Sequence, residues 1–99
     1  AATLPRATTA AADALDATAL RGAITAAGSP IAGLAYCVGS IVLKPLGRTT
    51  EADLVDTFRL NAAGAALAVQ AAAPGLAAGQ GAVVLFSSVA ARAGFANHV

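Results

Sequence analysis

The sequence has little charge, few aromatic side chains and almost no cysteine. Only 11% of its 99 residues are charged and the formal net charge is +1, so no basic surface for nucleic acid is expected. Cys37 is the single cysteine, which excludes an internal disulfide and favours a reducing compartment such as the cytoplasm. Methionine and tryptophan are absent. We therefore expect a small domain with an aliphatic core, whose partner is a small molecule or another protein.

Although aromatic residues are few and methionine and tryptophan are absent, the chain is apolar, with 58% hydrophobic residues and a mean hydropathy of +0.73. Residues 60–91 contain no charged side chain, a length that would suffice for a membrane span. However, asparagine, glutamine, proline, glycine and serine interrupt this stretch, and much of the remainder is alanine. We predict a buried helix, a turn and a buried strand here, with no membrane span.

The first half of the chain predicts one helix with clear ends. Asp16 is a suitable N-cap for a weakly amphipathic helix over 17–27, and Gly28 follows as a stop. We also consider a short strand over 10–15 before this helix. Residues 1–12 have no clear period and are predicted to be a loop.

The second half predicts two strands joined by a long helix. Apolar runs at 34–39 and 82–86 indicate strands that are buried on both faces. Between them, a capping box that starts at Thr50 opens a helix over 51–73, which Pro74 should break or kink. Alternation of strands and helices indicates βαβ crossovers, and therefore an α/β fold with a parallel sheet.

Two serines follow the last predicted strand, at the end where parallel sheets bind ligands. Ser87 and Ser88 come after Phe86, and ligands of open α/β sheets sit at the carboxyl ends of the strands. Serine also ends strands as a turn former. From position alone, the serine hydroxyls are therefore candidates for a catalytic or a turn-forming role.

Three motifs occur in the order and at the spacing of one enzyme family. Residues 36–39 (Tyr-Cys-Val-Gly) stand where that family has Asn-Asn-Ala-Gly at the end of a strand. Residues 60–64 (Leu-Asn-Ala-Ala-Gly) match its Val-Asn-x-x-Gly motif within a helix. Residues 81–90 match its strand Gly-x-Ile-Val-x-x-Ser-Ser-x-Ala. The chain resembles the short-chain dehydrogenase/reductase family of nicotinamide-dependent oxidoreductases.

The resemblance implies both a fold and a reaction. Residues 1–99 would be the central βαβαβ portion of a single NAD(P)-binding domain with a Rossmann-type, doubly wound parallel sheet. The reaction would interconvert a ketone and a secondary alcohol by hydride transfer, with NAD or NADP as cofactor. Through the small residues of the helix over 51–73, a homodimer or homotetramer would form.

Roles for individual residues also follow from the resemblance. Ser88 would hold the substrate oxygen, and Asn61 would support the proton relay. Five residues would contact the cofactor: Asp13 at the adenine, then Tyr36, Cys37, Val38 and Gly39. The alternatives are a turn serine at Ser88, a buried and satisfied amide at Asn61, and a turn-capping aspartate at Asp13. No metal site is predicted, because His98 has no partner ligand at suitable spacing; this histidine is either a solvated loop residue or a substrate contact.

The sequence also departs from the family pattern. The Gly-rich dinucleotide loop is expected before residue 1, and the Tyr-x-x-x-Lys pair just beyond Val99, so we expect the chain alone to be inactive. Tyr36 and Cys37 replace the two asparagines of the family motif. The alternative to an enzyme is therefore a non-catalytic binding or assembly module with a degenerate active site.

Overall fold

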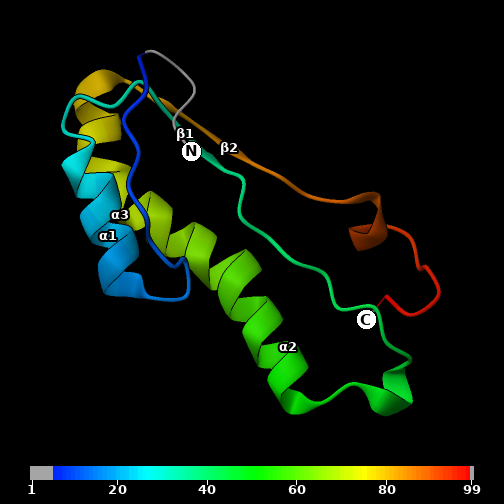
Figure 1. Cartoon of the computed structure of the whole chain (residues 1–99). Coiled ribbons are helices and arrows are strands. Elements are labelled where there is room, and N and C mark those ends of the chain that lie inside the picture. Colours follow the sequence, from blue (N-terminus) through cyan, green and yellow to red (C-terminus); the bar gives the residue numbers. More distant parts are fainter. Residues whose placement is uncertain (1–5, 99) are drawn as a thin grey trace.

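The computed structural model describes residues 6–98, in which two helical segments accompany a small parallel sheet (Figure 1). Strand β1 (Gly33–Tyr36) pairs in parallel with β2 (Ala82–Leu85). The helices are α1 (Ala17–Ala26), α2 (Glu51–Phe58) and α3 (Gly64–Gly79), with a π-helical turn at Arg59–Ala63 and 3-10 turns at Leu46–Arg48 and Val89–Ala91. Helix α3 contacts α1 and both strands. The predicted α/β class with a parallel sheet is confirmed.

Helix α1 begins and ends as its sequence predicts. The Asp16 carboxylate accepts hydrogen bonds from the backbone N–H groups of Thr18 and Ala19, both at 3.1 Å. After the helix, Gly28 has a φ of +88°, a left-handed conformation that glycine adopts without steric cost. The short strand considered over 10–15 is not formed, because the Asp13 side chain accepts from the Leu15 N–H at 2.9 Å and closes a turn instead.

The long helical segment starts as predicted but does not end at Pro74. The capping box of Thr50 and Asp53 is present, whereas α3 continues through Pro74 to Gly79. A proline inside a helix costs about 3 kcal/mol. Tertiary packing offsets that cost, because Leu76 is buried and the Gly75 carbonyl accepts from the Ile31 N–H at 2.8 Å.

Both strands are shorter and more exposed than the sequence predicts. Strand β1 ends at Tyr36 and β2 at Leu85, so the predicted strand residues that follow, up to 39 and 86, leave the sheet. Every residue of β2 is exposed, with Val84 at 50%. Burial on both faces is thus wrong within the described residues, because α3 contacts this pair of strands and no other described helix does.

The combined helix Glu51–Gly79 is long and apolar enough to cross a membrane by length and composition. Core helices of α/β domains pass the same test, and α3 contacts α1 and both strands. On the remaining surface of the combined helix, Val55 of α2 and Leu67 of α3 are 46% and 38% exposed. The expected self-association through residues 51–73 stays a prediction.

Candidate functional site

A cavity of about 1190 Å³ opens where the two parallel strands end. The segment after β1, the inner side of the helical segment and the segment after β2 form its walls. Six of the seven residues predicted to act lie on this wall: Tyr36, Cys37, Val38, Gly39, Asn61 and Ser88. Ligand pockets range from about 300 to 1,000 Å³, so the cavity is large enough to hold a small molecule.

Asn61 joins the helix to the segment that follows β1. Its Oδ1 accepts from the Ser40 N–H at 3.1 Å, and its Nδ2 donates to the Ser40 carbonyl at 3.1 Å and to the Thr57 carbonyl at 2.9 Å. The residue sits in the π-helical turn Arg59–Ala63, a local widening of the helix that is frequent at functional sites. Asn61 therefore fixes the backbone of the opposite wall. Its part in a proton relay stays a prediction.

Ser88 has an oriented hydroxyl. Its Oγ accepts from the Ala90 N–H at 3.1 Å and caps the 3-10 turn that follows. This bond uses one lone pair, so the hydroxyl proton remains free to donate into the cavity. The turn-forming role that the sequence suggested is thus present, and it leaves the donor available.

Two glycines allow close contact between the strand and the helix. A Cβ at Gly39 would lie 2.8 Å from Asn61 Oδ1, and a Cβ at Gly64 would overlap the Tyr36 hydroxyl. The Tyr36 side chain is buried and its hydroxyl donates to the Leu60 carbonyl at 2.6 Å. Burial raises the pKa of the Tyr36 phenol above its usual 10.0, so this donor stays protonated at neutral pH.

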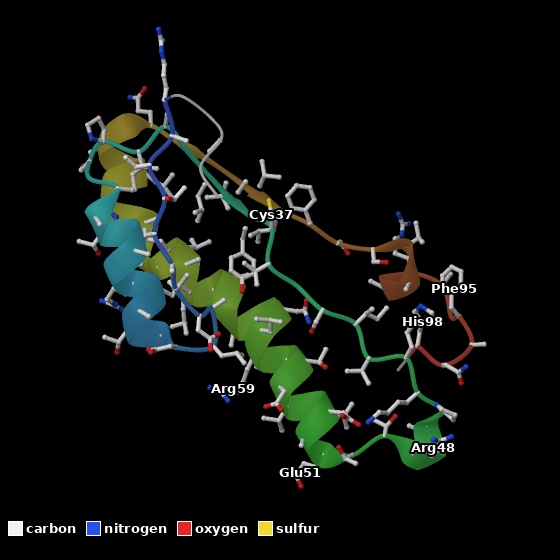
Figure 2. All side chains as sticks on the ribbon, viewed as in Figure 1. Cys37, Arg48, Glu51, Arg59, Phe95 and His98 are labelled. Atoms are coloured by element: carbon white, nitrogen blue, oxygen red, sulfur yellow. The ribbon has the colours of Figure 1, made fainter. Side chains whose placement is uncertain are left out.

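Asp13 lies outside this cavity. Its carboxylate accepts from Leu15 N–H and its carbonyl from Asp16 N–H, each at 2.9 Å, so both groups serve a turn. Its adenine contact stays a prediction. Cys37 is an exposed, free thiol at the end of β1 (Figure 2). No group of three or more potential metal ligands occurs within residues 6–98.

The structure places His98 on the cavity wall, whereas the sequence left open a solvated loop residue and a substrate contact. Its Nδ1 lies 2.8 Å from the Ala96 carbonyl, and its ring centroid is 5.6 Å from that of Phe95. Figure 2 shows the Phe95 and His98 side chains near each other. The Lys44 N–H donates to the Asn97 carbonyl at 3.0 Å, and Leu43 pairs with His98 across the two loops. No local pattern signalled this contact, because it joins segments more than fifty residues apart.

An ion pair lies at the start of α2, where Asp53 borders the cavity. Lys44 Nζ donates to Asp53 Oδ2 at 2.8 Å, while the same carboxylate accepts from the Thr50 N–H at 3.0 Å. The hydrogen bond from Lys44 and then that from the Thr50 backbone hold the pKa of Asp53 below its usual value of 3.8. The pair ties the loop after β1 to the start of α2.

Replacing Lys44 by methionine in the full-length protein is expected to destabilise the fold at neutral pH and leave it unchanged in strong acid. Because the folded-state pKa of Asp53 is lowered, ionised Asp53 stabilises the fold above pH 3.8, and that contribution is lost as the pH falls through the folded-state pKa. Thermal unfolding from neutral pH to about pH 2 measures the difference. Lys44→Arg is the control that keeps the charge. A pH-independent difference would contradict the expected coupling.

Comparison with known proteins gives one family and a set of solved structures. The model of a family described as enoyl-(acyl carrier protein) reductase matches residues 1–99, and curated proteins give no match. A short-chain dehydrogenase from Streptomyces avermitilis superposes with a TM-score of 0.82 and 26% identity, covering 94% of this chain and 36% of that chain. Serine dehydrogenase from Escherichia coli superposes with a TM-score of 0.76 and 17% identity, covering 89% of this chain and 43% of that chain.

A third solved structure, the closed form of serine dehydrogenase complexed with NADP+, also has a TM-score of 0.76 and 17% identity, and covers 89% of this chain and 38% of that chain. The chain therefore spans 36% to 43% of the length of these relatives. They share its Rossmann-type sheet, and the family match includes all three motifs on the cavity wall. The chain belongs to the short-chain dehydrogenase/reductase family.

Proposed function

We propose that the full-length protein is an NAD(P)-dependent oxidoreductase that interconverts a ketone and a secondary alcohol by hydride transfer. The observation that supports this most directly is the placement of Ser88 and Asn61 on one cavity at the carboxyl ends of parallel strands. The Ser88 hydroxyl donates to the substrate oxygen, where negative charge develops as a ketone is reduced. Its acceptor side is already bonded to the Ala90 N–H, which fixes its position.

The residues present fit the nicotinamide half of the cofactor. The backbone of residues 36–39 borders the cavity, and Gly39 has no side chain to obstruct a ribose there. Asn61 holds the adjoining Ser40 backbone on both its N–H and its carbonyl. When bound, NAD(P) supplies or accepts the hydride. The solved complex of a structural relative with NADP+ supports this class of cofactor without deciding between NAD and NADP.

The family description adds a second reaction class, reduction of an enoyl thioester. The two classes differ in where the hydride goes. In ketone reduction it attacks the carbon that bears the oxygen, so a single hydroxyl donor next to that oxygen acts on the reacting centre. Ser88 on the cavity wall is such a donor. The same hydroxyl would also serve the thioester oxygen of an enoyl substrate, which becomes an enolate oxygen, so the substrate panel below decides between the two classes.

The test uses the full-length protein with NADH and NADPH against a panel of ketones and, separately, an enoyl thioester. Cofactor oxidation is followed by its absorbance, and cofactor binding is measured independently by fluorescence. We expect oxidation with at least one ketone. Turnover of the enoyl thioester alone would overturn the proposed substrate class. Cofactor binding without turnover of either class, or no binding at all, would favour a binding or assembly module.

A further inference from the structure

Tyr36 occupies a position where the family motif has asparagine, and its side chain reaches the helix rather than a neighbouring strand. Its hydroxyl donates to the Leu60 carbonyl at 2.6 Å, and the residue is only 7% exposed. In a regular α-helix the Leu60 carbonyl would accept from the N–H of Gly64. Here the Gly64 N–H donates to the Arg59 carbonyl instead. The Tyr36 hydroxyl thus supplies a donor to a carbonyl that the π-helical turn has released.

Gly64 makes this contact possible. A Cβ at this position would overlap the Tyr36 hydroxyl and lie 3.2 Å from its Cζ and 3.3 Å from the Arg59 carbonyl oxygen. The tyrosine ring therefore lies directly on the helix backbone. The three features depend on one another: the ring needs the glycine, and the hydroxyl bonds the carbonyl freed by the π-helical turn.

The same turn contains Asn61, next in sequence to Leu60. Asn61 holds both backbone groups of Ser40, four residues after Tyr36. The turn is thus attached to the end of β1 at one point and to the following loop at a second point. Between these two points lie Cys37, Val38 and Gly39, which border the cavity.

We infer that the Tyr36 hydroxyl is a positioning group, which holds the π-helical turn so that Asn61 meets Ser40 at the cavity wall. This inference rests on the proposed function for its kinetic consequence, but its geometric part does not. Loss of the hydroxyl leaves the Leu60 carbonyl without this donor and allows Asn61 to shift. Misplacement of about 1 Å near a reacting centre lowers turnover by up to a hundredfold, so a partial effect on the order of tenfold is expected.

The experiment is a double-mutant cycle in the full-length protein with Tyr36→Phe, Asn61→Ala and both together. We expect Tyr36→Phe to lower kcat about tenfold with little change in KM or in cofactor affinity. In the Asn61→Ala background, the same change should have no further effect, because Tyr36 acts through Asn61. Multiplicative losses would overturn the inference. A loss of cofactor affinity in Tyr36→Phe with kcat unchanged would also overturn it and would give Tyr36 a role in cofactor binding alone.

Hydrogen exchange at the Ser40 amide tests the geometry without activity. This N–H is held by Asn61 Oδ1, so it should exchange faster in Tyr36→Phe than in the unmutated protein. Ile31→Val is the control, because it trims a side chain that packs against Gly75, away from the turn. Equal exchange at Ser40 in Tyr36→Phe and Ile31→Val would show that Tyr36 only packs. Faster exchange in a protein without hydride transfer would retain this inference and refute the proposed function.

Discussion

Replacing Ser88 by alanine in the full-length protein is expected to lower kcat for ketone reduction on the order of a hundredfold or more. A preorganised hydrogen-bond donor at a developing oxyanion contributes about that much, because its interaction strengthens as negative charge forms on the oxygen. The Ser88 hydroxyl is on the cavity wall and its proton is not used by the Ala90 contact. Steady-state kinetics with the best ketone of the panel gives the ratio.

Ser87→Ala is the matched control, since it removes the same group one residue earlier. It should stay within a few fold of the unmutated protein, as expected for a residue that does not bond the reacting oxygen. Ser88→Ala also removes the cap of the 3-10 turn, a change worth about 1 kcal/mol of stability. Thermal unfolding of both variants separates that effect from catalysis. Activity of Ser88→Ala within about threefold of the unmutated protein would refute the assignment.

The sequence predicted the arrangement of elements because its local signals agree with the tertiary structure. Asp16 and Thr50 cap helices where side-chain oxygens meet free backbone donors. The strand ends at Tyr36 and Leu85 bring distant motifs to one edge of the sheet, as parallel pairing requires. The motif at residues 60–64 marked Asn61 within the long helix. The helix caps, the strand ends and the motif residues therefore all agree with the arrangement around the cavity.

Other features depend on contacts that no local pattern contains. The helix passes Pro74 because packing of its neighbours, including the bond from the Ile31 N–H to the Gly75 carbonyl, outweighs the local penalty. The bond from Tyr36 to Leu60 needs the glycine at position 64 and the π-helical turn at the same time. His98 reaches the cavity through pairing with a loop far away in sequence. Each of these is a property of two segments together, which a reading of either segment alone does not reveal.

Replacing Asn61 is expected to cause the second large loss of activity. Two variants, Asn61→Ala and Asn61→Asp, distinguish the hydrogen bonds that its amide donates from the one that it accepts. In Asn61→Ala the three bonds to Ser40 and Thr57 are lost. We expect kcat to fall on the order of a hundredfold, because the backbone beside Gly39 is no longer held at the cavity wall. Stability should fall by about 0.5–1.5 kcal/mol, the usual net contribution of a hydrogen bond, because the groups left without a partner are exposed or only partly buried. Urea unfolding and steady-state kinetics measure the two losses.

In Asn61→Asp one carboxylate oxygen still accepts from the Ser40 N–H, but no group donates to the carbonyls of Ser40 and Thr57, at 3.1 and 2.9 Å. A negative charge then faces two carbonyl oxygens, so this variant should be no more stable than Asn61→Ala, despite its closer shape. Gln70→Ala is the control: it removes an amide of α3 that bonds Arg21 and lies outside the cavity. If Asn61→Asp retained full stability and turnover, the amide donor would be dispensable, and Asn61 would act only as an acceptor for the loop after β1.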